Sequence, residues 1–257
     1  VAQNGGGLNE KDQRVLLLSV NTGNLGTRSA LTDDEKQIND MTVGIYDKSG
    51  NYRVVASLAS GSADKEASGT APGTFTTTSG ANVKVVTSTL QEDDQVLVAV
   101  NRGDAAFTSK PSPADFSNVT MDATTALQFK ASSTDIDATK FPKFGTAKLP
   151  AGNNSTFTAT VSVKNLVSKV TLEDLSVSFT GPYANATFTP SEIFLLNVPD
   201  KLAFSTTGQS GTSTYLNGTD IDKNGGKTGT KTAVLATATT GASALGSGSA
   251  SYTAKPI

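Results

Sequence analysis

The sequence contains no cysteine, no histidine and no tryptophan. Without cysteine, the chain has no disulfide framework, no thiolate metal site and no cysteine nucleophile. Without histidine, it lacks Ser-His catalytic triads, most zinc hydrolase sites and the commonest general base. Because tryptophan is absent and only five tyrosines occur, few residues are available to stack on a sugar ring.

Charge and hydrophobic runs exclude further classes. The formal net charge is −2 with scattered lysines, whereas a nucleic-acid-binding protein normally carries a basic face, so we expect no nucleic-acid partner. No run approaches the roughly 18 apolar residues of a membrane helix. The 257 residues suit one large or two ordinary domains. We expect Val1 to follow a processed or engineered start whose targeting signal is not shown.

Serine and threonine make up about a quarter of the chain, and short runs of alternating apolar and polar residues recur along it. This pattern is typical of an all-β protein whose strand faces carry hydroxyls toward solvent. The almost wholly apolar run 95–101 indicates a central strand covered on both faces. We expect strands at 14–20, 41–46, 52–56, 83–87, 95–101, 126–130, 155–163, 170–179 and 232–236, and an extended stretch over 188–198.

The alternation restarts at 164–169, which indicates a domain boundary. We therefore predict an N-terminal strand and loop over 1–28, a first domain over 29–165 and a second over 166–257. The Gly-, Ser- and Thr-rich tract after Phe204 is typical of surface loops.

The N-terminal block has an order that an enzyme would not need. An apolar strand, 14–20, is followed by a loose loop ending in Arg28, and then by Thr32-Asp33-Asp34-Glu35. Thr and Glu at this spacing form a capping box, which fixes the start of a short helix. A second short helix is expected after Ser112-Pro113. The N-terminal strand is thus joined to the body by a segment that a protease would sever.

Acidic clusters offer the only catalytic or metal-binding candidates. The runs Glu92-Asp93-Asp94 and Glu173-Asp174 would provide carboxylate pairs for glycoside hydrolysis, but solvated turn charges explain them better. Asp220, Asp222 and Asn224 match the first half of a calcium loop, although its twelfth position is Lys231 instead of Glu. Both a calcium site and a plain surface turn stay open here.

Two segments together resemble the fimbrillin family, the shaft pilins of type V fimbriae of Bacteroidales. The first begins at Leu16-Leu17-Leu18-Ser19-Val20, passes Arg28 and Asp33-Asp34-Glu35, and ends at 41–46. The second runs from Leu166-Val167-Ser168-Lys169-Val170 to Val198. The ordered pair of segments, and no single motif, carries the resemblance over residues 14–204.

This resemblance implies two transthyretin-like β-sandwich domains, export as a lipoprotein precursor, and cleavage between Arg28 and Ser29 by an Arg-specific surface protease. Loss of the N-terminal strand would open a hydrophobic groove, which a strand from the C-terminus of a neighbouring subunit would fill. The last residues, 251–257, do not form the long apolar strand that such a donor needs. Either the donor strand is truncated or it is unusual.

The displaced strand implied by the resemblance includes Val15, Leu16, Leu17, Leu18 and Val20. Leu16, Leu18 and Val20 would fill the groove, with Val15 and Leu17 on the opposite face. Burying three such side chains stabilises by about 5 to 9 kcal/mol before ordering costs.

The sequence therefore predicts a structural, non-enzymatic subunit of a surface fimbria outside the outer membrane. It needs no cofactor, and its partners would be other pilin subunits, the protease and host or bacterial adhesion receptors. The alternative is a tip or surface lipoprotein adhesin that recognises glycan or protein through the 205–250 loops. A flagellin-like subunit fits less well, because no long terminal helices are readable.

Overall fold

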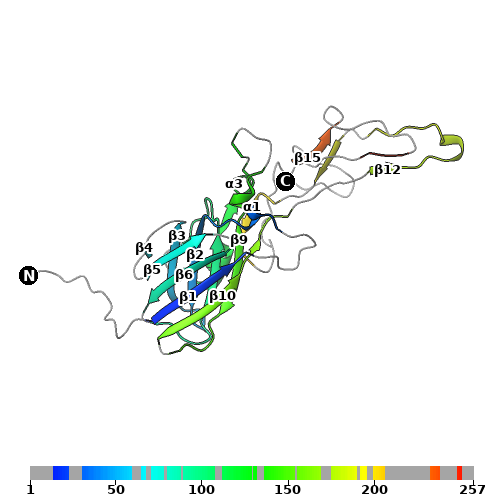
Figure 1. Ribbon diagram of the computed structural model, residues 1–257. Coiled ribbons are helices and arrows are strands. Elements are labelled where there is room, and N and C mark those ends of the chain that lie inside the picture. Colours follow the sequence, from blue (N-terminus) through cyan, green and yellow to red (C-terminus); the bar gives the residue numbers. More distant parts are fainter. Residues whose placement is uncertain are drawn as a thin grey trace, which may run out of the picture. The chain divides into compact units, whose positions relative to one another are not determined.

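Figure 1 shows the computed structural model of the chain. The contacts divide the chain into two compact units, the first comprising Val1–Gln128, Asp137–Leu166 and Leu202–Ser210, and the second the remainder. The structure describes residues 14–22, 31–59, 65–67, 71–77, 80–87, 89–107, 112–128, 130–131, 136–153, 155–168, 175–189, 192–195, 199–205, 232–237 and 248–250. The predicted domain ranges 1–28, 29–165 and 166–257 stay a prediction.

The first unit contains two five-stranded sheets. In sheet A the order is β10 (Thr156–Ser162), β1 (Arg14–Asn21), β6 (Gly80–Thr87), β5 (Ala71–Thr77) and β4 (Lys65–Ala67). In sheet B it is β11 (Lys164–Asn165), β9 (Lys143–Lys148), β7 (Gln95–Val100), β2 (Asp40–Tyr46) and β3 (Tyr52–Ala59).

The apolar core lies between these two sheets. Sheet A contributes Leu16, Leu18 and Val20 of β1 and Phe157 and Val161 of β10. Sheet B contributes alternate residues of β2 and β7 and one residue of β3: Met41, Val43, Ile45, Val54, Val96, Val98 and Val100. All but the first residue of β7 are buried, and β7 lies between β9 and β2. The prediction of a central strand covered on both faces is thus confirmed.

The outer face of sheet B is also covered. Helix α2 (Pro113–Asn118) places the Phe116 ring against β2, where a Cβ added to Gly44 would lie 2.9 Å from that ring. Phe116 packs edge-on to Tyr46, with ring centroids 6.4 Å apart. Phe204, from the 202–210 segment of the first unit, packs on Phe107 with ring centroids 5.6 Å apart. A glycine in β2 is therefore required for the close approach of α2.

The helices are short and capped. α1 (Asp33–Lys36) begins at the predicted Thr32 cap, and α2 has Pro113 in its first turn after a Ser112 cap. A 3-10 helix, η2 (Ala138–Lys140), precedes β9. In the described part of the chain, no helix is long and apolar enough to cross a bilayer.

One predicted strand, 126–130, is wrong. The structure instead forms α3 (Ala123–Ala126), and Leu127 N–H donates to the Ala123 carbonyl at 2.9 Å. This bond closes a helical turn where an extended strand was expected. The alternation of apolar residues over so few positions does not distinguish the two.

The described residues of the second unit are also mainly β-structure. β12 (Leu175–Val177) pairs with β16 (Gly248–Ala250), and β13 (Glu192–Leu195) pairs with β15 (Thr232–Thr237), both antiparallel. η3 (Gly181–Tyr183) carries Tyr183, which is 71% exposed. In the first unit, β8 (Thr120–Asp122) pairs with β14 (Lys201–Ala203). The all-β fold class is confirmed.

Candidate functional site

The first strand of the chain lies in the interior of sheet A. β1 pairs antiparallel with β6, from Arg14↔Thr87 to Asn21↔Gly80. On its other edge it pairs parallel with β10, from Val15↔Thr156 to Asn21↔Ser162; Figure 1 shows β1 beside both strands. Among the described strands, β1 alone joins β10 to sheet A. Removing β1 would therefore detach β10 from the sheet as well as open the core.

The side chains of β1 alternate between the core and the opposite face. Leu16, Leu18 and Val20 are buried, whereas Leu17 is 45% exposed and Val15 is half-buried. This alternation is the one expected from the sequence. β1 thus occupies a groove one strand wide. The groove is bounded by β6 and β10, and the three buried side chains of β1 fill its floor. Its displacement stays a prediction.

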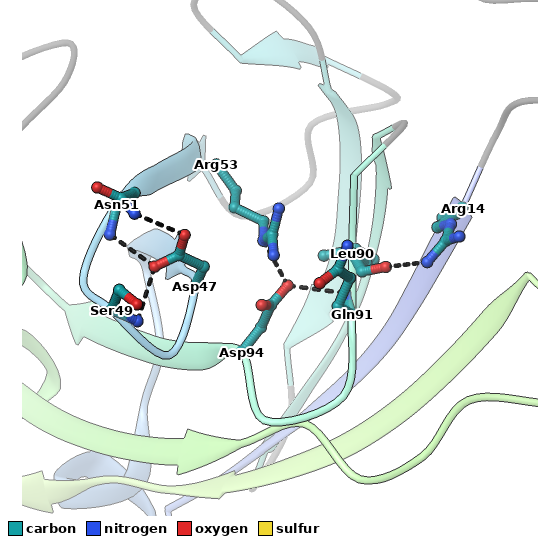
Figure 2. Close-up of polar contacts among 8 residues, drawn as sticks. All are labelled: Arg14, Asp47, Ser49, Asn51, Arg53, Leu90, Gln91 and Asp94. Atoms are coloured by element: carbon teal, nitrogen blue, oxygen red, sulfur yellow. Dashed lines mark hydrogen bonds and ion pairs between the residues drawn. The ribbon is translucent and has the colours of Figure 1, made fainter.

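The start of β1 is fastened by two contacts. The backbone N–H of Val15 donates to the Ser155 carbonyl at 2.8 Å. The Arg14 guanidinium donates to the Leu90 carbonyl, which lies in the connection between β6 and β7 (Figure 2). A cation thus binds at the end of the groove, beyond the paired part of β6.

The connection that holds the Leu90 carbonyl is braced by a buried carboxylate. Asp94 is 1% exposed, and its Oδ2 lies 2.7 Å from Arg53 Nε and accepts from Gln91 N–H at 2.8 Å (Figure 2). Leu149 exchanges backbone hydrogen bonds with Asp93 and Asp94 at 2.9 and 2.8 Å. The interpretation of Asp94 as a solvated turn charge is therefore wrong, because the charge is buried and paired. Glu92 and Asp93 are exposed.

A second acidic turn fixes the start of β3, the strand that carries Arg53. The Asp47 carboxylate accepts from the side chain of Asn51 and from the backbone N–H groups of Ser49 and Asn51, each at 2.8 Å (Figure 2). The Asn51 side-chain bond, assisted by its backbone bond, lowers the pKa of Asp47. Gly50 adopts φ +84°, which favours glycine. This turn joins β2 to β3 and so positions Arg53.

At the other end of β1, the Asn21 carbonyl accepts from Val163 N–H at 2.9 Å. The predicted cleavage residues Arg28 and Ser29 lie outside the described residues. The described chain resumes before α1, where the Thr32 hydroxyl accepts from Glu35 N–H at 3.2 Å and Thr32 N–H donates to Glu35 Oε2 at 2.6 Å. The predicted capping box is confirmed, so the segment after the loop has its own local order.

Two buried polar side chains fasten this segment to sheet B. The amide nitrogen of Asn101 donates to the carbonyls of Gln37, Thr139 and Phe141 at 3.0, 3.2 and 2.9 Å, and its oxygen accepts from Asn39 N–H at 2.8 Å. The Lys143 ammonium donates to Gln37 and Phe141 carbonyls at 3.1 and 2.8 Å. The stretch 37–39 is therefore held from both β9 and the end of β7.

Lys143 has no carboxylate within ion-pairing distance among the described residues. Burial lowers the pKa of Lys143 to about 7, and the charge of Glu35 opposes this shift. The unfolded chain has the ordinary value of 10.5. Between these two values the unfolded chain binds a proton that the folded chain does not, so stability rises with pH over this window.

The other sequence candidates are not assembled into a site. Asp220, Asp222 and Asn224 of the predicted calcium loop lie outside the described residues, as does the Glu173-Asp174 pair. Within the described ranges, no group of three acidic residues is placed to hold a metal ion.

Comparisons with known proteins find solved structures that are similar to this chain. No protein-family model and no curated protein matches the sequence. A candidate cell adhesion protein from Parabacteroides distasonis matches with a TM-score of 0.56 at 12% identity, over 94% of this chain and 68% of that chain. A candidate cell adhesion protein from Bacteroides eggerthii matches with a TM-score of 0.46 at 17% identity, over 75% of this chain and 52% of that chain.

A fimbrilin from Porphyromonas gingivalis also matches, with a TM-score of 0.46 at 15% identity, over 78% of this chain and 54% of that chain. The chain spans about half the length of the Bacteroides and Porphyromonas proteins. At these identities, the similarity to the Parabacteroides protein shows a shared fold and nothing about activity.

Sequence reasoning found the strand but missed the polar residues at its ends. Arg14 directly precedes the apolar run, which is the only local signal that it belongs to the groove. Asp94 and Arg53 are 41 positions apart in the sequence, and no motif spacing predicts that their side chains pair. Asn101 adopts φ +53°. Asparagine tolerates this conformation better than most residues, so its residue type is the only sequence signal for this position.

The two faces of β1 predict different mutational costs. We expect Leu18→Ala to lower the free energy of unfolding by about 3 kcal/mol, because it leaves a cavity in the core. Leu17→Ala, on the opposite face of the same strand, is the matched control and should change it by less than about 0.5 kcal/mol. Urea unfolding followed by circular dichroism measures both, and equal costs would contradict the placement of Leu18 in the core.

Asn101 should be among the least replaceable polar residues of the first unit. Asn101→Ala removes four part-buried hydrogen bonds to backbone groups and should cost about 3 kcal/mol of unfolding free energy. Asp93→Ala is the control, because Asp93 also has a positive φ, 67°, but is exposed; backbone strain alone should cost about 1 kcal/mol. The same urea titration compares them, and similar losses would show that strain, not hydrogen bonding, dominates at Asn101.

Lys143 gives a prediction for pH dependence. We expect the difference in unfolding free energy, wild type minus Lys143→Met, to rise between pH 7 and pH 9.5 by about 1 kcal/mol per pH unit. In this range Lys143 binds a proton in the unfolded chain but not in the folded one, and this stabilisation of the unfolded chain weakens as the pH rises. Unfolding at several pH values measures this difference. Parallel curves for the two proteins would mean that the Gln37 and Phe141 carbonyls keep Lys143 protonated in the fold.

Proposed function

We propose that this chain is a structural subunit of a bacterial surface fimbria, which polymerises by protease-triggered donor-strand exchange. Cleavage between Arg28 and Ser29 by an Arg-specific surface protease would release β1. A strand from another subunit would then fill the groove and link the two. In this proposal the subunit is not an enzyme, needs no cofactor and acts outside the outer membrane after export as a lipoprotein precursor.

The observation that carries the proposal is the position of β1. It is the first described strand of the chain, yet it lies between β6 and β10 in the sheet and contributes Leu16, Leu18 and Val20 to the core. Its covalent link to the body is confined to the short stretch between Asn21 and Thr32, which contains Arg28. A terminal strand with one severable link is the arrangement that strand exchange requires.

The anchoring of the segment after the loop supports the same mechanism. The Thr32 cap and the hydrogen bonds from Asn101 and Lys143 to the Gln37 carbonyl hold residues 32–39 independently of β1. A cut within the loop would therefore leave the new N-terminus of the body attached to sheet B.

Strand exchange, rather than permanent loss of β1, is favoured by the energetics of the groove. An empty groove would expose the apolar side chains that contact β1 and would leave the pairing groups of β6 and β10 without partners. Because such edges are ready templates for another strand, the cleaved subunit would bind one strongly. In its finer form, the proposal is that the chain has two transthyretin-like β-sandwich domains and that its copies form a homopolymer.

An adhesin is the second candidate. The exposed aromatic residues Tyr183 and Phe188 in the second unit would suit recognition of a glycan or protein receptor, whether of host or bacterial origin. Glycan-array binding by the unassembled monomer would favour this function over a shaft subunit.

The role of Arg28 is tested by assembly. Treatment of the purified full-length precursor, which carries the donor strand, with an Arg-specific protease should give fibres visible by negative-stain electron microscopy. Arg28→Ala should reduce fibre formation at least about tenfold, because β1 would stay covalently attached. Arg102→Ala, which removes an arginine outside the loop, is the matched control and should assemble normally. Fibres from Arg28→Ala at the wild-type rate would contradict cleavage at this bond.

A further inference from the structure

The groove that holds β1 ends in a polar contact that apolar packing does not explain. Beyond the last residue of β6, the Leu90 carbonyl accepts a hydrogen bond from the Arg14 guanidinium (Figure 2). The Leu90 side chain is itself fully buried, so its backbone is held in place by the core. A fixed carbonyl therefore faces the position two residues before the first buried residue of the strand, Leu16.

This carbonyl is polarised by the charges behind it. The peptide unit between Leu90 and Gln91 directs its N–H to the Asp94 carboxylate at 2.8 Å and its carbonyl to Arg14. Asp94 is in turn paired with Arg53 at 2.7 Å and is 1% exposed. Hydrogen bonds in such a chain strengthen one another in a low-dielectric environment. The buried carboxylate thus makes the Leu90 carbonyl a better acceptor for a cation.

The contact also resolves an ambiguity in strand register. A slip of one residue would turn Leu16 and Leu18 to the wrong face, so packing excludes it. A slip of two residues keeps apolar side chains in the core and is not excluded by their alternation. It would, however, move the basic side chain by about 6.7 Å along the strand, away from the Leu90 carbonyl. The cation contact therefore selects one register among those that packing allows.

Strand direction is selected in the same way. β1 runs parallel to β10 and antiparallel to β6. A strand entering in the opposite direction would place its leading basic residue at the far end of the groove, near Asn21, where the backbone contact is with Val163. Only a strand with the direction of β1 brings that residue to Leu90.

We propose that the Leu90 carbonyl, supported by Asp94 and Arg53, is a receptor for a basic side chain that selects the incoming strand. The strand it accepts carries Arg or Lys two residues before the first of three alternating apolar residues, and runs parallel to β10. This inference rests on the proposed strand exchange and adds a specificity-determining contact to it.

The test uses the full chain with a site-specific protease sequence inserted between Gly26 and Thr27. After cleavage, fluorescent peptides covering residues 11–22 compete for the groove, and anisotropy gives their affinities. The Arg14→Ala peptide should bind about tenfold more weakly than the wild-type peptide, as expected for loss of a hydrogen bond to a charged group. The Lys11→Ala peptide is the matched control: it loses the same charge outside the strand and should bind within about twofold of wild type.

Two further arms examine direction and polarisation. A peptide with the residues of 11–22 in reverse order should bind at least about tenfold more weakly. Asp94→Asn in the cleaved chain should reduce the preference for the wild-type over the Arg14→Ala peptide. If that variant fails to fold, the peptide series on the cleaved chain with Asp94 intact still tests the proposal.

The outcomes separate this inference from the function on which it rests. Equal binding of the wild-type and Arg14→Ala peptides, with exchange intact, would overturn the receptor role of Leu90 and leave strand exchange standing. Equal losses for Arg14→Ala and Lys11→Ala would reduce the contact to general charge attraction and overturn it too. Failure of every peptide to enter the groove would overturn both proposals.

Discussion

The first unit depends on one strand that is peripheral in sequence and internal in structure. β1 contributes three buried side chains to the core and hydrogen-bonds on both edges. Sheet A is continuous only while this position is filled, because β10 reaches the other described strands of the sheet through β1 alone. The stability of β1, of β10 and of the core that they cover therefore depends on whether the β1 position is occupied.

Polar contacts that do not involve β1 limit how far this dependence extends. At the start of the groove, Asp94 and Arg53 fix the connection that carries Leu90. Beyond its other end, Asn101 and Lys143 hold the segment that follows the loop. Neither set relies on β1 for its internal bonds. The surroundings of the groove are therefore ordered by contacts that would persist when one strand is exchanged for another.

The sequence was informative where structure is local or periodic. The alternation of Leu16, Leu18 and Val20, the Thr32 capping box and the fully apolar β7 follow from short-range rules, and the structure confirms each. β9, with the sequence Lys-Phe-Gly-Thr-Ala-Lys, was not predicted, because its strand character comes from pairing with β7 and not from its own pattern. The helix α3 was mistaken for a strand for the converse reason.

The polar part of the site was beyond local reasoning. Asp94 lies in an acidic run that reads as solvated, and only the approach of Arg53 from another strand makes it a buried pair. The same holds for Lys143, because one of its two carbonyl partners, Gln37, lies 106 positions away in the sequence. Such contacts depend on long-range packing, which a single sequence does not encode in any short motif.

The parallel pairing of β1 with β10 has a consequence for how the chain is made. Val15 pairs with Thr156, so the first strand stays unpaired on that edge until most of the first unit has been synthesised. Contacts this distant in sequence form slowly, and an unpaired apolar strand invites pairing between chains in the meantime. A delay in folding until both partner strands are available, or a factor that covers the unpaired edge, would limit such pairing between chains.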